Sequence, residues 1–181
     1  MGRNIEVKAR IDDQGAVLTR ARSLADGGPL ELSQDDTFFA CPTGRLKLRV
    51  LGDGTGELIH YDRGDAAAPK PCAYVIAPVT APAGLRDVLA RAYGAIGRVR
   101  KERTVFLVGN TRIHVDRVEG LGDFVELEVV LSHTDTDERG VAVADELLDA
   151  LVGGLGLGVA TAQRVAGSYL DLLQGTEKDN R

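Results

Sequence analysis

Polar and apolar residues alternate with a period of two over several short stretches of the chain. In residues 3–11, RNIEVKARI, the apolar side chains from Ile5 onward occupy the odd positions and the polar ones the even positions. This alternation is typical of a strand with one face buried. Similar patterns and turn residues between them predict further strands over residues 35–40, 45–51, 56–63, 72–79, 97–109, 111–118 and 124–132.

Helical spacing of apolar residues predicts four helices, over residues 16–26, 82–93, 137–152 and 161–174. Pro82 suits the first turn of its helix, and Gly94 suits its end. The sequence GLGLG at 154–158 lacks the Lys-Ser/Thr pair of a phosphate-binding loop, so we interpret it as a break between helices. The polar residues 176–181 are expected to form a frayed tail.

Strands and helices do not alternate strictly, which indicates an α+β fold with a largely antiparallel sheet. About eight strands could close into a barrel, which would leave no free sheet edge. The sequence therefore predicts an eight-stranded antiparallel barrel, closed or nearly closed, with flanking helices. We expect residues 1–175 to form a single domain.

Composition narrows the class of protein. The chain has 181 residues, 44% of them hydrophobic, and a formal net charge of −5. This acidic balance argues against a general nucleic-acid binder, and no apolar run reaches the roughly 20 residues of a membrane helix. Cys41 and Cys72 fit neither a metal spacing nor a disulfide framework. We expect a cytoplasmic, bacterial protein that has no membrane partner and could form a homodimer.

Charged residues recur on one face of four predicted strands. These residues are Glu6, Lys8 and Arg10; Arg45, Lys47 and Arg49; Arg112, His114 and Asp116; and Glu126 and Glu128. If helices cover the apolar faces of a barrel, the charged faces point inward and form a charged tunnel. The alternative is an ordinary sheet whose polar face lies in solvent and carries cross-strand salt bridges.

A tunnel with both signs of charge suits a polyphosphate and its metal ions. Carboxylates at alternate positions provide the oxygen ligands that Mg²⁺ and Mn²⁺ prefer, and Arg and Lys bind phosphate oxygens. His114 could carry a proton or be a polar wall residue. Tyr61 and Arg63 could contact a base or a phosphate.

Several stretches resemble the CYTH, or triphosphate tunnel metalloenzyme, superfamily, and in particular its class IV adenylyl cyclase-like branch. The stretches are NIEVKAR, RLKLR, VRKERTVFLVGNTRIHVDRVEGLGDFVELE and SYLDLL, and the resemblance covers nearly the whole chain. It implies an eight-stranded antiparallel tunnel that binds a triphosphate with Mg²⁺ or Mn²⁺.

The resemblance also implies roles for individual residues. Glu6, Glu126 and Glu128 would be metal ligands, and Asp116 would lie near the metals or orient the attacking oxygen. Phosphates would be held by Lys8, Lys47, Arg49, Lys101 and Arg103. With the tunnel-face residues added, the catalytic candidates are Lys8, Asp116 and His114, and further substrate contacts are Arg10, Arg63 and Arg112.

The chain departs from the family pattern at a few positions. The family signature is ExExK, and Asn4 stands at its first glutamate. The family's Arg-x-Arg is Lys47-x-Arg49 here, and Ala73 and Val75 stand where the family often has a basic and then an acidic residue. These departures suit a weaker second metal site, a different substrate or an altered reaction.

The first expectation for function is the conversion of ATP to cyclic AMP and pyrophosphate. The alternatives are hydrolysis of inorganic, nucleoside or thiamine triphosphate, a biosynthetic reaction on another diphosphate-bearing substrate, and a non-catalytic module that binds nucleotides or polyphosphate. In every case the partner is a small molecule, a triphosphate or diphosphate ester.

Overall fold

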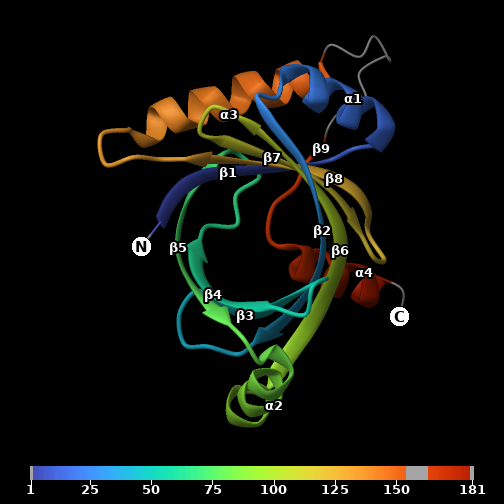
Figure 1. The fold of residues 1–181 in the computed structure, drawn as a ribbon, viewed down its shortest axis with the longest axis vertical. Helices are drawn as coiled ribbons and strands as arrows, with labels where there is room; N and C mark the ends of the chain where they lie inside the picture. Colours follow the sequence, from blue (N-terminus) through green and yellow to red (C-terminus); the bar gives the residue numbers. More distant parts are fainter. Residues whose placement is uncertain (1, 154–162, 180–181) are drawn as a thin grey trace.

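Eight antiparallel strands close into a barrel. The computed structural model describes residues 2–153 and 163–179. The strands follow the order β5-β4-β3-β2-β6-β7-β8-β1, and pairing of β1 with β5 closes the ring (Figure 1). Their bounds are β1 Gly2–Arg10, β2 Gly27–Phe39, β3 Arg45–Leu51, β4 Gly56–Arg63, β5 Lys70–Val79, β6 Ala95–Val108, β7 Thr111–Val118 and β8 Gly122–Val130. A short strand β9, Gln163–Arg164, pairs with the end of β1.

The described residues form four helices around the barrel: α1 Gln14–Leu24, α2 Pro82–Tyr93, α3 Asp137–Val152 and α4 Tyr169–Asp179. Figure 1 shows α1 and α3 together over one side of the barrel and α2 at the opposite side. In the described part of the chain, none of the helices is long and apolar enough to cross a membrane.

The predicted α+β barrel is confirmed, and the helix predictions for 82–93 and 137–152 match α2 and α3. The last helix begins at Tyr169 and not at residue 161, because the chain first forms β9. It continues to Asp179 and so includes most of the predicted tail. The predicted break at 154–158 lies outside the described residues.

The apolar side of β1 faces out of the barrel, toward the helices. Ile5, Val7 and Ala9 are at most 1% exposed and belong to a core cluster that also contains residues of α1 and α3. Gly140 permits the close approach of α3, since a Cβ there would lie 2.6 Å from Ile5 Cγ1. With its apolar residues covered from outside, β1 must turn its polar residues inward, because successive side chains alternate between faces.

A second core cluster lies inside the barrel, where α4 packs against it. It includes Phe38, Phe124, Tyr169 and Leu170, and the ring of Phe124 meets that of Tyr169 edge to face at 5.0 Å between centroids. A Cβ at Gly97 would lie 2.2 Å from Leu170 Cδ1, so only glycine lets α4 pack this closely against β6. The helix thus fills part of the barrel interior and limits the depth of the tunnel.

Candidate functional site

The barrel interior contains a cavity of about 570 Å³ lined by all eight barrel strands and by Ser168 and Tyr169. In the described part of the chain its wall carries seven cationic side chains and five carboxylates. They are Lys8, Lys47, Arg49, Arg63, Lys101, Arg103 and Arg112, and Glu6, Asp36, Glu57, Glu126 and Glu128. An excess of positive charge in a confined space favours an anionic ligand.

Asp36 on β2 is surrounded by three cations on one side of the cavity. Its carboxylate is 2.7 Å from Lys47 Nζ and 3.3 Å from Lys101 Nζ, and it accepts hydrogen bonds of 2.8 and 3.0 Å from Arg49. Burial by itself would raise the pKa of Asp36, but Arg49, Lys101 and Lys47 outweigh it and hold this pKa well below 3.8. Arg49 also lies 3.8 Å from Glu57 Oε2. Two carboxylates cannot compensate three cations, so this group retains positive charge that can bind phosphate.

The two lysines of this group are poorly stabilised as cations. Burial, with Arg49 as the next cause, lowers the pKa of Lys47 to about 8. Burial also lowers the pKa of Lys101 to about 7; Asp36 opposes the shift, and Arg103, Arg49 and Lys47 add to it. A bound anion would stabilise both ammonium groups, because an opposite charge nearby favours the charged form.

Arg103 on β6 links the cations to the acidic side of the cavity. Its Nε and Nη2 donate hydrogen bonds of 2.6 Å each to Asp116, and Nη2 donates a further one of 2.9 Å to Glu126. Tyr169 Oη also donates to Asp116, at 2.8 Å. Asp116 is 0% exposed and is not among the residues that line the cavity. Asp116 therefore orients Arg103 but does not itself line the cavity.

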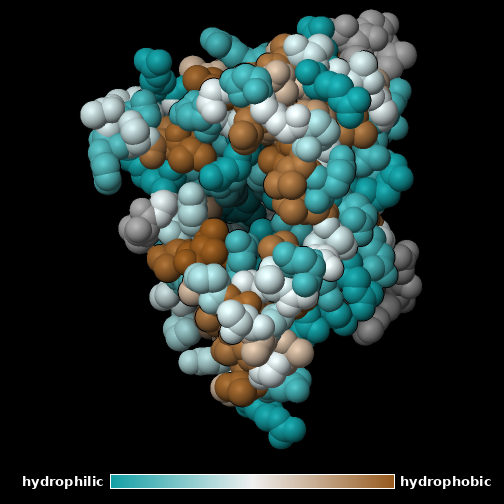
Figure 2. Space-filling model, viewed as in Figure 1, coloured by the Kyte–Doolittle hydropathy of each residue, from teal (hydrophilic) through white to brown (hydrophobic). Residues whose placement is uncertain are grey.

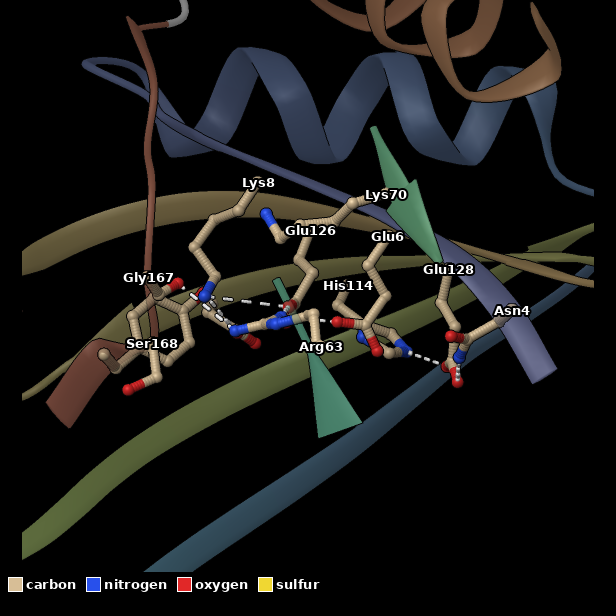
Figure 3. Close-up of polar contacts among 12 residues, drawn as sticks. Asn4, Glu6, Lys8, Arg63, Lys70, His114, Glu126, Glu128, Gly167 and Ser168 are labelled. Carbon is tan, nitrogen blue, oxygen red and sulfur yellow. Dashed lines mark hydrogen bonds and ion pairs between the residues drawn. The ribbon is translucent and has the colours of Figure 1, made fainter. Parts of the chain in front are cut away.

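Arg63 on β4 reaches across the tunnel to the carboxylates of β1 and β8. Figure 3 shows its guanidinium between Glu6 and Glu126. It donates a hydrogen bond to Glu6 and lies 3.7 Å from Glu126 Oε1. Lys8 Nζ is also 3.7 Å from Glu126 Oε1 and lies 4.0 Å above the centre of the Tyr169 ring. Burial, opposed most strongly by Glu126, lowers the pKa of Lys8.

Glu128 forms a separate group with Asn4, Arg112 and His114. Asn4 donates its side-chain amide to Glu128 (Figure 3), Arg112 Nη1 is 3.0 Å from Glu128, and His114 Nε2 is 3.7 Å away. Asn4 is fully buried, and its Oδ1 has no hydrogen-bond partner within the described residues. Burial, with Arg103 as the next cause, lowers the pKa of His114 to about 3, so this imidazole is neutral near pH 7.

The carboxylates of the cavity wall are oxygen ligands of the kind that a divalent metal accepts. In the described ranges no three Asp, Glu, His or Cys side chains gather closely enough to form a metal cage. Mg²⁺ needs no such cage, since proteins usually bind it through one or two carboxylates together with substrate phosphates. Glu6, Glu126 and Glu128 face the cavity. Asn4 lies beside Glu128 but is fully buried and does not line the cavity, although its Oδ1 has no partner within the described residues.

The structure brings together most of the predicted site residues. The residues that line the one cavity are Glu6, Lys8, Lys47, Arg49, Arg63, Lys101, Arg103, Arg112, His114, Glu126 and Glu128. Arg10 does not line it; its guanidinium donates to the carbonyl of Leu121 and lies 4.7 Å from the centre of the Phe124 ring. Arg45 instead binds Asp65 and Asp171, at 2.8 and 2.9 Å.

The departures at Ala73 and Val75 do not change the tunnel wall. In β5 the cavity is lined by Cys72, Tyr74 and Ile76, whereas Val75 is 52% exposed on the other face. The pairing of Cys72 with Arg63 fixes this alternation. Ala73 and Val75, which stand where the family often has a basic and then an acidic residue, are therefore not part of the tunnel wall.

Asp36 was missed as a site residue in the sequence. Its strand contains DDTFF, where Phe38 and Phe39 are both buried on opposite faces, so the apolar pattern did not reveal which aspartate points inward. Gln34 was missed because the predicted strand began at residue 35, whereas β2 begins at Gly27. It is buried in the cavity wall, and its Oε1 has no partner in the described part of the chain.

The chain is similar to known proteins in sequence and in fold. The profile of the CYTH domain matches residues 2–152. No curated protein sequence gives a significant match. Among solved structures, a Pyrococcus horikoshii protein superposes with a TM-score of 0.77 at 23% identity, covering 94% of this chain and 99% of its own.

Two other solved structures have names that refer to an activity. A candidate adenylate cyclase from Vibrio parahaemolyticus superposes with a TM-score of 0.69 at 22% identity, covering 94% of this chain and 97% of its own. A Hippeastrum protein described as an adenylyl cyclase candidate with dominant triphosphatase activity gives 0.68 at 15% identity, and 96% of each chain is covered. At these identities the likeness establishes a shared fold.

Proposed function

Since the chain belongs to the CYTH domain family, whose members typically process triphosphates, we propose that it cleaves a phosphoanhydride bond of a triphosphate inside its tunnel. The observation that carries this proposal is the buried excess of cations around Asp36. Lys47, Arg49 and Lys101 come from two different strands and converge on one carboxylate. A chain of phosphates along this wall would satisfy them better than Asp36 alone can.

A divalent metal fits the opposite wall. Mg²⁺ or Mn²⁺ held by Glu6, Glu126 and Glu128 would neutralise phosphate charge when it is bound there. Arg63 now contacts Glu6 and Glu126, and it would turn to the phosphate oxygens when these carboxylates are engaged. Lys8 and Arg103 would remain beside Glu126 and hold the substrate between the two walls.

Hydrolysis fits the site better than cyclisation. In hydrolysis a water oxygen forms a bond to the terminal phosphorus, the bridging P–O bond breaks, and its electron pair leaves with the diphosphate, whose leaving oxygen takes up the proton that the water loses. Such a reaction needs mainly positioning and charge neutralisation. Cyclisation of ATP also needs a held ribose and base. The solvent-exposed lining residues are aliphatic, such as Leu30, Ile76 and Leu107, whereas the lining aromatic residues Phe38, Tyr61 and Tyr169 are at most 8% exposed.

An assay of products tests the proposal. Purified protein with Mg²⁺ or Mn²⁺ is incubated with tripolyphosphate, ATP, GTP and thiamine triphosphate, and phosphate, pyrophosphate and cyclic nucleotide are measured. We expect phosphate release that a chelator abolishes and that Glu126→Gln removes. Release of cyclic AMP and pyrophosphate would replace hydrolysis with cyclisation. Neither binding nor cleavage of any triphosphate would reject the proposal.

A further inference from the structure

The cavity has an aliphatic half that the phosphate site does not use. Six of its lining residues, here called the aliphatic rim, are Leu30, Leu32, Leu51, Ile76, Val105 and Leu107. They lie on β2, β3, β5 and β6. Figure 2 shows hydrophobic residues on both sides of a hollow whose interior is hydrophilic.

The strand register places this rim at one end of the tunnel. Along β2, Leu30 and Leu32 precede Gln34 and Asp36, and on the antiparallel partner β6 Val105 lies opposite Leu30. Leu30, Ile76 and Leu107 are 56, 47 and 42% exposed. Lys8 and Lys101, by contrast, are each 4% exposed. The rim is therefore the solvent-facing part of the cavity, and the cations lie deeper.

The hydrophobic core of the described residues does not include the rim residues. In the described part of the chain, none of the six belongs to any of the three hydrophobic core clusters. Isolated exposed leucines are ordinary. Six aliphatic side chains that converge on the wall of a ligand cavity are typical of a binding site, because such pockets combine apolar walls with a few polar groups that fix orientation.

We infer that the substrate carries an aliphatic group esterified to its phosphates, and that the aliphatic rim binds this group. The inference rests on the proposed function, because the phosphates must occupy the cationic part of the tunnel. A cavity of about 570 Å³ is in the range of organic ligands of a few hundred daltons, so the cavity has room beyond the phosphate site.

The chemistry of the rim favours an aliphatic group over a nucleobase. Binding of a base usually involves an aromatic ring on which it can stack. Among the aromatic residues that line the cavity, Phe38, Tyr61 and Tyr169 are at most 8% exposed within the second core cluster, and Tyr74 packs against that cluster, so the exposed part of the wall is left to the aliphatic rim. Branched aliphatic side chains gain most from covering flexible hydrocarbon, whose transfer from water is favourable in proportion to its buried area.

Calorimetry with stable substrate mimics tests the inference. The probes are ethyl, butyl, hexyl and octyl monoesters of methylenediphosphonate, with the unsubstituted diphosphonate and tripolyphosphate as references, all in the presence of Mg²⁺. We expect affinity to rise about two- to four-fold for each added methylene until the rim is covered. Affinity that does not depend on chain length would overturn the inference.

A double variant localises the effect. Leu30→Thr with Ile76→Thr should reduce the ratio of octyl to ethyl affinity at least about ten-fold, because both changes remove aliphatic surface from the rim. Val88→Thr is the matched control, since Val88 is 61% exposed on α2 and does not line the cavity. An unchanged ratio in the double variant would overturn the inference, as would a dimer in solution that the double variant converts to monomer.

The references separate this inference from the proposed function. If tripolyphosphate and the unsubstituted diphosphonate fail to bind, the proposed function fails and the inference fails with it. If both bind and the alkyl chain adds nothing, only the aliphatic group is rejected.

Discussion

Arg103 on β6 and Asp116 on β7 lie directly opposite each other, and the guanidinium of Arg103 donates two hydrogen bonds of 2.6 Å to the carboxylate of Asp116. Arg103 lines the cavity and Asp116 does not. The carboxylate therefore acts on a ligand through the arginine that it orients. This geometry assigns Asp116 a positioning role, where the family resemblance suggested a place near the metals or the attacking oxygen.

Asp116→Asn should lower the free energy of unfolding by about 3 kcal/mol, because it leaves a buried guanidinium with less compensation. It should also weaken tripolyphosphate binding, since Arg103 is no longer held. Denaturant unfolding and calorimetry measure the two effects. Tyr169→Phe is the control: it removes one hydrogen bond to Asp116 and should cost only about 1 kcal/mol. Equal effects of the two changes would contradict the role of Asp116.

The barrel could be predicted from the sequence because its strands alternate cleanly. In β1 the apolar positions pack under α3, and Glu6 and Lys8 on the other face line the tunnel. The start of β2 was missed, because Gly28 and Pro29 at its beginning are residues that usually mark turns. The prediction accordingly began this strand at residue 35, whereas β2 begins at Gly27.

The site residues could be predicted in those strands where polar and apolar positions alternate clearly. Glu126 and Glu128 alternate with apolar residues, and both line the cavity. In β5, CAYVIAPV is apolar on both faces, so the sequence could not show that Cys72 and Tyr74 point inward. Alternation shows on which face of a strand a residue lies, but not whether the cavity extends to the end of the strand. Arg10, the last residue of β1, is on the same face as Glu6 and Lys8 and yet lies against Phe124.

Asp36→Asn should make the free protein less stable and increase its response to anions. Lys47, Arg49 and Lys101 would lose the carboxylate that they share, at a cost of about 3 kcal/mol. Bound tripolyphosphate would take its place. Thermal unfolding with and without tripolyphosphate should therefore give a larger upward shift in Tm for the variant than for the wild type, and a smaller one would contradict this account.

Binding of an anion should be coupled to proton uptake. The pKa of Lys101 is lowered to about 7 and that of Lys47 to about 8, and a bound phosphate would raise both. Near pH 8 we expect uptake of about one proton, and affinity should fall as the pH rises from about 7 to 9.

The free protein should show the opposite trend. Because the pKa of Lys101 is about 7 in the folded state against 10.5 as its ordinary value, the unfolded chain binds more protons between these pH values, and the free energy of unfolding rises with pH there.

The proton uptake that accompanies anion binding is measured by calorimetry in buffers of different ionisation enthalpy. Comparison with Lys101→Arg subtracts the protons of the ligand itself, and equal uptake by the two proteins would count against Lys101.

Asn4→Glu should make stability depend on a divalent metal. Asn4 is fully buried and donates its amide to Glu128, so a glutamate would place two carboxylates together at a cost of about 3 kcal/mol. Mg²⁺ or Mn²⁺ would relieve this repulsion. Asn4→Gln controls for side-chain length. We expect metal to raise the Tm of Asn4→Glu more than that of Asn4→Gln, and equal responses would mean that this position does not face a metal.

Titration of tripolyphosphate into the protein in the presence of Mg²⁺, followed by calorimetry, tests most directly whether the charged tunnel is a phosphate site. The wild type should bind one tripolyphosphate per chain. Arg49→Gln should weaken binding about ten-fold or more, because Arg49 lines the cavity. Arg100→Gln should bind like the wild type, because the Arg100 side chain is 51% exposed and does not line the cavity. No saturable binding, or equal affinities of the two variants, would contradict the account.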